Sequence, residues 1–260
     1  MPTVTGSHRR LNRSLLAESE KRLLVAIARR LPPSINSDHL SALALASMLV
    51  VGTGFAIMRV APAGVLLVIA GLLANWFGDS LDGTVARVRG HERPRFGYYV
   101  DHVIDLAGTA ALFAGLACSG LMTASVAMAV LAGYFLVSAE VYLATHAAGI
   151  FRMSCGGIGP TELRILLGTG ALYATWRPVV LVPWLGAERL FDVGGAIALV
   201  GFAVVFVVSG VRQTRDLYRL EPRPHGIPQS PRAGEPSLPP GLAPALTVVS
   251  RSGPASRIPV

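Results

Sequence analysis

The chain has 260 residues, of which 52% are hydrophobic and 15% are charged, and its mean hydropathy is +0.54. A soluble domain has about 25% charged residues, so this composition excludes an ordinary soluble globule and a wholly disordered chain. The net charge is +8, but no basic face interleaved with aromatic residues is present, so nucleic acid is not an expected partner. Cys118 and Cys155 have no CxxC partner and predict neither a zinc site nor a disulfide framework.

The first segment, residues 1–38, is polar and basic. Within it, apolar residues recur at helical spacing, opposite charged residues, until Pro32-Pro33. This pattern predicts an amphipathic helix on the cytoplasmic membrane surface, and a simple basic anchor is the alternative. Ser37 or Asp38 is expected to cap the helix that follows. The apolar stripe consists of Leu16, Leu23, Leu24, Ile27 and Leu31.

Long apolar runs dominate residues 39–215, and a bilayer span needs about 20 such residues. Basic residues gather in every second loop, which predicts that both termini are cytoplasmic, with a bacterial plasma (inner) membrane as the expected location. The proline-rich residues 216–260 are expected to form a disordered cytoplasmic tail. The fold class is therefore predicted as all-α, an integral membrane bundle of six transmembrane helices at residues 40–60, 61–87, 96–121, 124–148, 161–183 and 190–211.

Four carboxylates flank the second cytoplasmic loop. Asp79 and Asp82 share a face of one helix, and Asp101 and Asp105 share a face of the next. A short turn predicts that these helices are antiparallel neighbours, so the acids converge at the cytoplasmic end of the membrane. Carboxylates are costly there and repel each other, and hard oxygen ligands suit Mg²⁺ or Mn²⁺. The acids therefore predict a site for two divalent ions, and solvated loop charges are the alternative.

Small residues lie on the same two faces, namely Gly83 and Ala86 on the first helix and Gly97 and Gly108 on the second. A bare face lets a bulky ligand approach the backbone, and it also lets helices pack closely. The sequence leaves both interpretations open.

The stretch 79–105 resembles the signature of the CDP-alcohol phosphatidyltransferase family, D-x-x-D-G-x-x-A-R followed by G-x-x-x-D-x-x-x-D. The matching residues are Asp79, Asp82, Gly83, Ala86, Arg87, Gly97, Asp101 and Asp105. All eight fixed positions are matched, across a spacer one residue longer than usual. The resemblance implies that a CDP-linked lipid or CDP-alcohol donor binds with its diphosphate on the metals. The hydroxyl of an acceptor alcohol then attacks phosphorus, and CMP leaves.

The resemblance also implies a role for each residue of the signature. Asp79, Asp82 and Asp101 would be metal ligands, and Asp105 would be the general base and a further metal ligand. Asn75, one turn before Asp79, is expected to reach the nucleotide or to hold Asp79. The residues expected against the substrate are Asn75, Gly83, Ala86, Arg87 and Gly97.

Other ionisable residues are candidates for contacts with the acceptor. Glu140 and His146 lie in the fourth predicted span, where interhelical pairing is the alternative role. Glu162 and Arg164 follow Gly159-Pro160-Thr161, which is typical of a helix start and is weakly similar to a stretch of some choline/ethanolaminephosphotransferases.

The acceptor stays open among glycerol 3-phosphate, inositol phosphate, serine and diacylglycerol. An anionic acceptor would use arginines near the metals, for which Arg93, Arg95, Arg152 and Arg164 are candidates. A homodimer is expected. Two other classes of function are an ion or small-molecule transporter that uses the acidic cluster, and a scaffold whose tail is the working part. The acids gather at one end of the spans, which favours the enzyme over the transporter.

Overall fold

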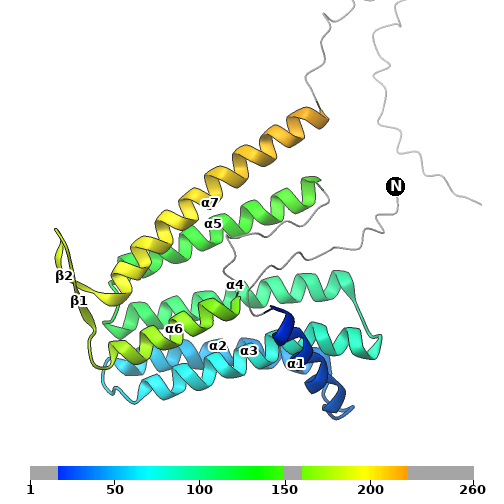
Figure 1. The fold of residues 1–260 in the computed structure, drawn as a ribbon, viewed down its shortest axis with the longest axis horizontal. Helices are drawn as coiled ribbons and strands as arrows, with labels where there is room; N and C mark the ends of the chain where they lie inside the picture. The colour runs from blue at the N-terminus through cyan, green and yellow to red at the C-terminus, as the bar shows by residue number, and fades with distance from the viewer. Residues whose placement is uncertain (1–16, 149–159, 222–260) are drawn as a thin grey trace, which may run out of the picture. The chain divides into compact units, whose positions relative to one another are not determined.

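A computed structural model describes residues 17–148 and 160–221 of the chain (Figure 1). The predictions that concern Leu16, Arg152, Cys155 and residues 222–260 fall outside these residues. Within the described ranges the chain forms seven helices and one two-stranded hairpin. The elements are α1 (Ala17–Arg30), α2 (Ser37–Met58), α3 (Gly64–Arg89), α4 (Pro94–Ser119), α5 (Ala124–Ala148), α6 (Pro160–Ala174), β1 (Val179–Val182), β2 (Gly186–Arg189) and α7 (Leu190–Leu220).

Five of the described helices are long and apolar enough to cross a membrane, namely α2, α3, α4, α5 and α7. Each coincides with a predicted span to within a few residues at its start, which confirms the all-helical membrane architecture. The last one continues beyond the predicted end at residue 211 and carries Asp216, assigned above to the tail, in its final turns.

The predicted span over residues 161–183 is wrong in its second half. The helix α6 has 15 residues, about 22 Å at the rise of an α-helix, whereas a bilayer core is about 30 Å thick. The helix ends before Pro178, which disfavours helical backbone at Arg177 and lacks an N–H of its own. An antiparallel hairpin follows, with Trp184 (φ 74°) and Gly186 (φ 89°) at its turn. A sixth span is therefore not confirmed.

The helix α1 packs against α3 rather than standing alone (Figure 1). Leu24 and Ala28 are buried in a cluster with Leu81 and Val85 of α3, and Ile27 contacts the same cluster. Part of the predicted membrane-facing stripe is thus used for packing within the protein. Placement of this helix on a membrane surface stays a prediction.

The turn after α1 is fixed by two sets of polar contacts. Asn36, rather than Ser37 or Asp38, caps α2: its side-chain oxygen accepts the His39 backbone N–H at 3.0 Å, and His39 Nδ1 accepts the Asn36 N–H at 3.4 Å. Such a reciprocal pair satisfies two backbone donors that the helix leaves free. Arg89, at the end of α3, donates to the carbonyls of Leu31 and Ile35 at 3.0 and 2.5 Å.

The helix α2 is the centre of the acid-bearing part of the bundle, because it packs against both α3 and α4. Glycines seven residues apart line the α3 side of this contact, a spacing that keeps one face towards a partner helix. A Cβ added at Gly71 or Gly78 would lie 2.7 Å from an atom of α2, and one added at Gly115 of α4 would lie 2.0 Å from the Gly52 carbonyl oxygen. The α3 glycines are Gly64, Gly71 and Gly78.

We predict that Gly115→Ala destabilises the bundle, because the new methyl group would force α2 and α4 apart. Overpacking of this kind costs about 1–3 kcal/mol. Gly201→Ala is the matched control, since a Cβ there meets no other atom of the described chain within 4 Å. Thermal unfolding in detergent should show a lower midpoint for Gly115→Ala alone, and equal midpoints for the two variants would contradict the packing.

Candidate metal and substrate site

Three of the four predicted acids come together. One carboxylate oxygen from each of Asp79, Asp101 and Asp105 lies within 4.8 Å of the others. Asp79 belongs to α3, whereas Asp101 and Asp105 stand one turn apart on α4, as their spacing predicts. Asp79 and Asp101 are half-buried and Asp105 is exposed. Oxygen donors at this separation fit a hard divalent cation.

Asp82 lies beside this trio but is held by another helix. Its Oδ2 accepts the Ser41 hydroxyl of α2 at 2.7 Å, and its Oδ1 accepts the Gly83 backbone N–H at 2.5 Å. Asp82 is nevertheless close enough to Asp79 and Asp101 for their charges to repel it. The structure therefore places Asp82 next to the trio and not within it, and its role as a fourth ligand stays a prediction.

The spacing of the two acid-bearing helices differs from the sequence-based expectation. Over the described residues, α3 and α4 both pack closely on α2, whereas the backbones of α3 and α4 do not pack closely on each other. The prediction of neighbouring helices is thus wrong in detail, because small residues draw each of them to α2 instead. The carboxylates of Asp79, Asp101 and Asp105 nevertheless meet across the remaining separation.

Arg164, a basic residue of α6, contacts one member of the acidic trio. Arg164 Nη2 donates to Asp79 Oδ2 at 2.5 Å, and Arg164 Nε donates to Asn75 Oδ1 at 2.8 Å. The amide of Asn75 is fixed in turn, because its Nδ2 donates to the Ala44 carbonyl oxygen at 3.0 Å. Asn75 was expected to reach the nucleotide or to hold Asp79. In the structure it accepts a hydrogen bond from Arg164, and Arg164 in turn donates to Asp79.

The glycines that share a face with the acids separate into two kinds. A Cβ added at Gly97 would meet no other atom of the described chain within 4 Å, and one added at Gly83 would meet the Arg87 guanidinium at 3.5 Å. Packing therefore does not require either glycine. At Gly108, by contrast, a Cβ would lie 2.9 Å from Met48, so that glycine serves helix packing. Arg87 also donates to the Thr84 hydroxyl at 3.2 Å.

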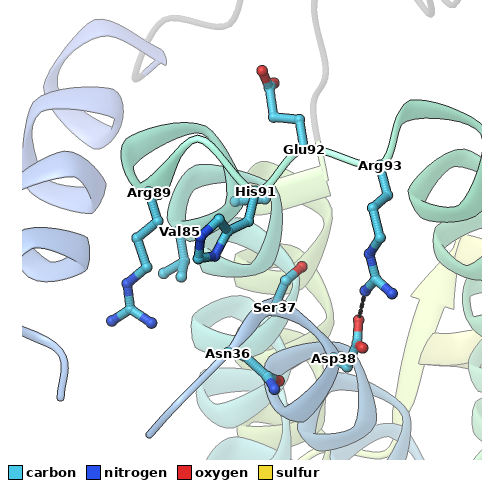
Figure 2. A pocket seen from close by; sticks show the side chains of 9 residues that line it. Asn36, Ser37, Asp38, Val85, Arg89, His91, Glu92 and Arg93 are labelled. Atoms are coloured by element: carbon cyan, nitrogen blue, oxygen red, sulfur yellow. Dashed lines mark hydrogen bonds and ion pairs between the residues drawn. The ribbon is translucent and has the colours of Figure 1, made fainter. Parts of the chain in front are cut away.

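An open pocket of about 370 Å³ lies between the start of α2 and the α3–α4 turn, and its lining includes none of the four acids and none of these glycines (Figure 2). Ala86 lines it, and an ion pair between Arg93 and Asp38 closes one side. Arg93 is therefore engaged away from Asp79, and Arg95 is exposed. The pocket gives the Ala86 side of α3 a polar surface that is open to solvent.

An aromatic cluster of α4 and α5 residues lies beside Asp101, a feature that the sequence analysis missed. The buried His102 ring stacks on Tyr98 at 4.1 Å and contacts Tyr142 edge-on at 5.1 Å. Its Nδ1 lies 2.7 Å from the Tyr98 carbonyl oxygen and 3.8 Å from Asp101. The i, i+4 spacing of Tyr98 and His102 was the available signal, and it indicates a shared face with Asp101 and Asp105.

The remaining candidates have other surroundings. Glu140 accepts the Ser209 hydroxyl of α7 at 2.9 Å on both oxygens, which is the interhelical pairing considered above. His146 is exposed, and Glu162 is half-buried at the start of α6.

Comparison with known proteins now identifies the chain. The profile of the family described as CDP-alcohol phosphatidyltransferase matches residues 39–209, which is more than half of the chain. The chain belongs to this family. It is accordingly a membrane transferase of phospholipid synthesis, which moves a substituted phosphate group from a CDP-linked donor to an acceptor alcohol with release of CMP.

A solved structure agrees with this assignment at the level of the fold. It is the crystal structure of Mycobacterium tuberculosis phosphatidylinositol phosphate synthase (PgsA1) with CDP-DAG bound, at 22% sequence identity and a TM-score of 0.54. The alignment covers 76% of this chain and 94% of that one. A search of curated proteins finds no match.

We predict that Gly97→Leu lowers activity without lowering the stability of the fold. The side chain has open space in the described fold, so the unfolding midpoint should stay at the wild-type value. A bulky side chain beside the acids should nevertheless lower kcat/KM for the CDP-linked donor about 10-fold or more, because small misplacements at a reacting centre are costly. Gly201→Leu on α7 is the matched control. Full activity of Gly97→Leu would show that no ligand approaches this face.

Proposed function

We propose that Asp79, Asp101 and Asp105 hold a divalent cation, Mg²⁺ or Mn²⁺, and that Asp82 contributes to a second one. The support is the donor set: three carboxylate oxygens within 4.8 Å of one another, with a fourth acid close by. Carboxylates with water are the ligands these ions prefer. When bound, such ions neutralise the charge of a diphosphate and hold it in line for displacement.

The donor in this proposal is CDP-diacylglycerol or another CDP-linked lipid or alcohol. The PgsA1 structure carries CDP-DAG, and its fold likeness to this chain supports a donor of that class. Gly83, Ala86 and Arg87 form the face of α3 against which the CDP group would lie. Ala86 borders the open pocket, and the two bare glycines leave room for the ligand.

Asp105 is proposed as the general base. It is the most exposed of the three acids, so it is the one that an acceptor reaches most easily from outside. It would take the proton of the acceptor hydroxyl as that oxygen forms a bond to phosphorus. The bond between the same phosphorus and the CMP oxygen then breaks, and a phosphodiester remains. General base catalysis of this kind contributes about 10²- to 10⁴-fold in rate.

The acceptor is an alcohol, and its identity is left for experiment. Of the arginines that an anionic acceptor would use, Arg164 lies at the acids, Arg93 is paired with Asp38, and Arg152 lies outside the described residues. Glu162, at the start of the same helix, is a second candidate contact. Glycerol 3-phosphate, inositol phosphate, serine and diacylglycerol are the compounds to compare.

The proposed setting is the bacterial plasma membrane, with the active site and both termini in the cytoplasm. The support is the distribution of charge: Arg87, Arg89, Arg93 and Arg95 surround the turn next to the acids, and basic residues favour the cytoplasmic side. The N-terminal segment would lie on that surface, residues 216–260 would include a disordered tail, and two copies would associate as a homodimer.

The experiment that tests this function is an assay of CMP release. Purified protein in detergent would receive CDP-diacylglycerol, Mg²⁺ and each candidate acceptor in turn, and then CDP-alcohols with diacylglycerol. One acceptor should give CMP and the matching phosphodiester, and EDTA should abolish both. No CMP with any pair of substrates would contradict the proposal.

We predict that Asp105→Asn lowers kcat about 10²- to 10⁴-fold, because the amide cannot accept the acceptor's proton. Asp79→Asn should remove activity through the metal centre instead, so raised Mg²⁺ should partly restore it. Asp216→Asn near the end of α7 is the matched control and should keep wild-type turnover. An Asp105→Asn variant with wild-type kcat would show that another group takes the proton.

A further inference from the structure

Arg164 is a basic side chain that the fold brings into direct contact with Asp79 of the acidic trio. Its side chain is 16% exposed and that of its partner Asp79 is 22% exposed, so water screens their attraction only partly. The two residues come from helices that are distant in the sequence. The contact therefore depends on the packing of α6 against α3, in which Gly168 leaves room for Ile69 and Leu72.

Asn75 makes the orientation of Arg164 specific. The amide is buried, and its Nδ2 is committed to the Ala44 carbonyl oxygen of α2, which turns Oδ1 towards Arg164 Nε. The guanidinium is thereby held at two points, by Asn75 through Nε and by Asp79 through Nη2. A planar group fixed at two nitrogens is a geometry that arginine supplies and lysine does not.

We infer that Arg164 is a built-in counterion of Asp79 that competes with the divalent cation for this carboxylate. The inference rests on the proposed metal centre and assigns Arg164 as a positioning residue of it. A guanidinium at 2.5 Å from Asp79 Oδ2 occupies one of the oxygens that a cation would use, and its charge repels a second positive charge nearby. Arg164 therefore weakens metal binding and stabilises the acidic trio without metal.

The test is the affinity of purified protein for Mn²⁺ alone, measured by electron paramagnetic resonance in detergent. Arg164→Gln should bind Mn²⁺ about 5- to 50-fold more tightly than the wild type, because the competing charge is gone. Arg164→Lys keeps the charge but loses the hydrogen bond to Asn75. Its affinity for Mn²⁺ should therefore lie between that of the wild type and that of Arg164→Gln. Asn75→Ser should also tighten binding, by releasing Nε.

Thermal unfolding gives a second readout. In EDTA the midpoint of Arg164→Gln should fall below that of the wild type, since the carboxylate of Asp79 loses its counterion. Addition of Mn²⁺ should then raise it by more than it raises the wild type. Arg189→Gln is the matched control: this arginine donates to the Thr123 hydroxyl in the turn between α4 and α5 and should leave Mn²⁺ affinity unchanged.

The outcomes separate this inference from the function proposed above. Unchanged or weaker Mn²⁺ binding by Arg164→Gln, with normal binding by the wild type, would overturn the competition and leave the metal centre standing. Absence of Mn²⁺ binding in the wild type, in Arg164→Gln and in Arg164→Lys would overturn both. Tighter binding in Arg164→Gln but not in Arg189→Gln would support both.

Discussion

The site depends on holding like charges together at the end of an apolar bundle. Carboxylates from α3 and α4 lie within 4.8 Å of one another, although such groups repel and are costly to bring out of water. The helix packing has to supply the free energy for this, and a cation has to offset the charge. The close helix contacts on α2 fix the acid-bearing helices, and Arg164 supplies positive charge beside Asp79.

Glycine has two different structural effects near the acids. Along α2, close contacts at Gly78 and Gly115 fix the positions of the two acid-bearing helices, since any side chain there would overlap backbone atoms. At Gly83 and Gly97 the described chain leaves space beside the acids instead. The same residue type thus allows close helix packing on one face and leaves open space on another, where the proposed function places the CDP-linked donor.

Local patterns predicted much of this from the sequence. Helix spacing placed Asp101 and Asp105 on one face, and apolar runs located the five long helices to within a few residues at their starts. Contacts between distant segments were not predictable: Ser41 meets Asp82 across 41 positions and Arg164 meets Asp79 across 85. Such pairs depend on how helices are arranged around α2, which no local pattern specifies. The hairpin was missed because its apolar residues continue the composition of α6.

The most direct measurement of the central claim is the position of manganese in crystals grown with CDP and Mn²⁺. Anomalous scattering locates this ion without reference to the surrounding chain. The account predicts a peak at coordinating distance from the carboxylates of Asp79, Asp101 and Asp105, with the CDP diphosphate beside it. A bound CDP with no manganese peak near these three acids, or with the peak at other residues, would contradict the account.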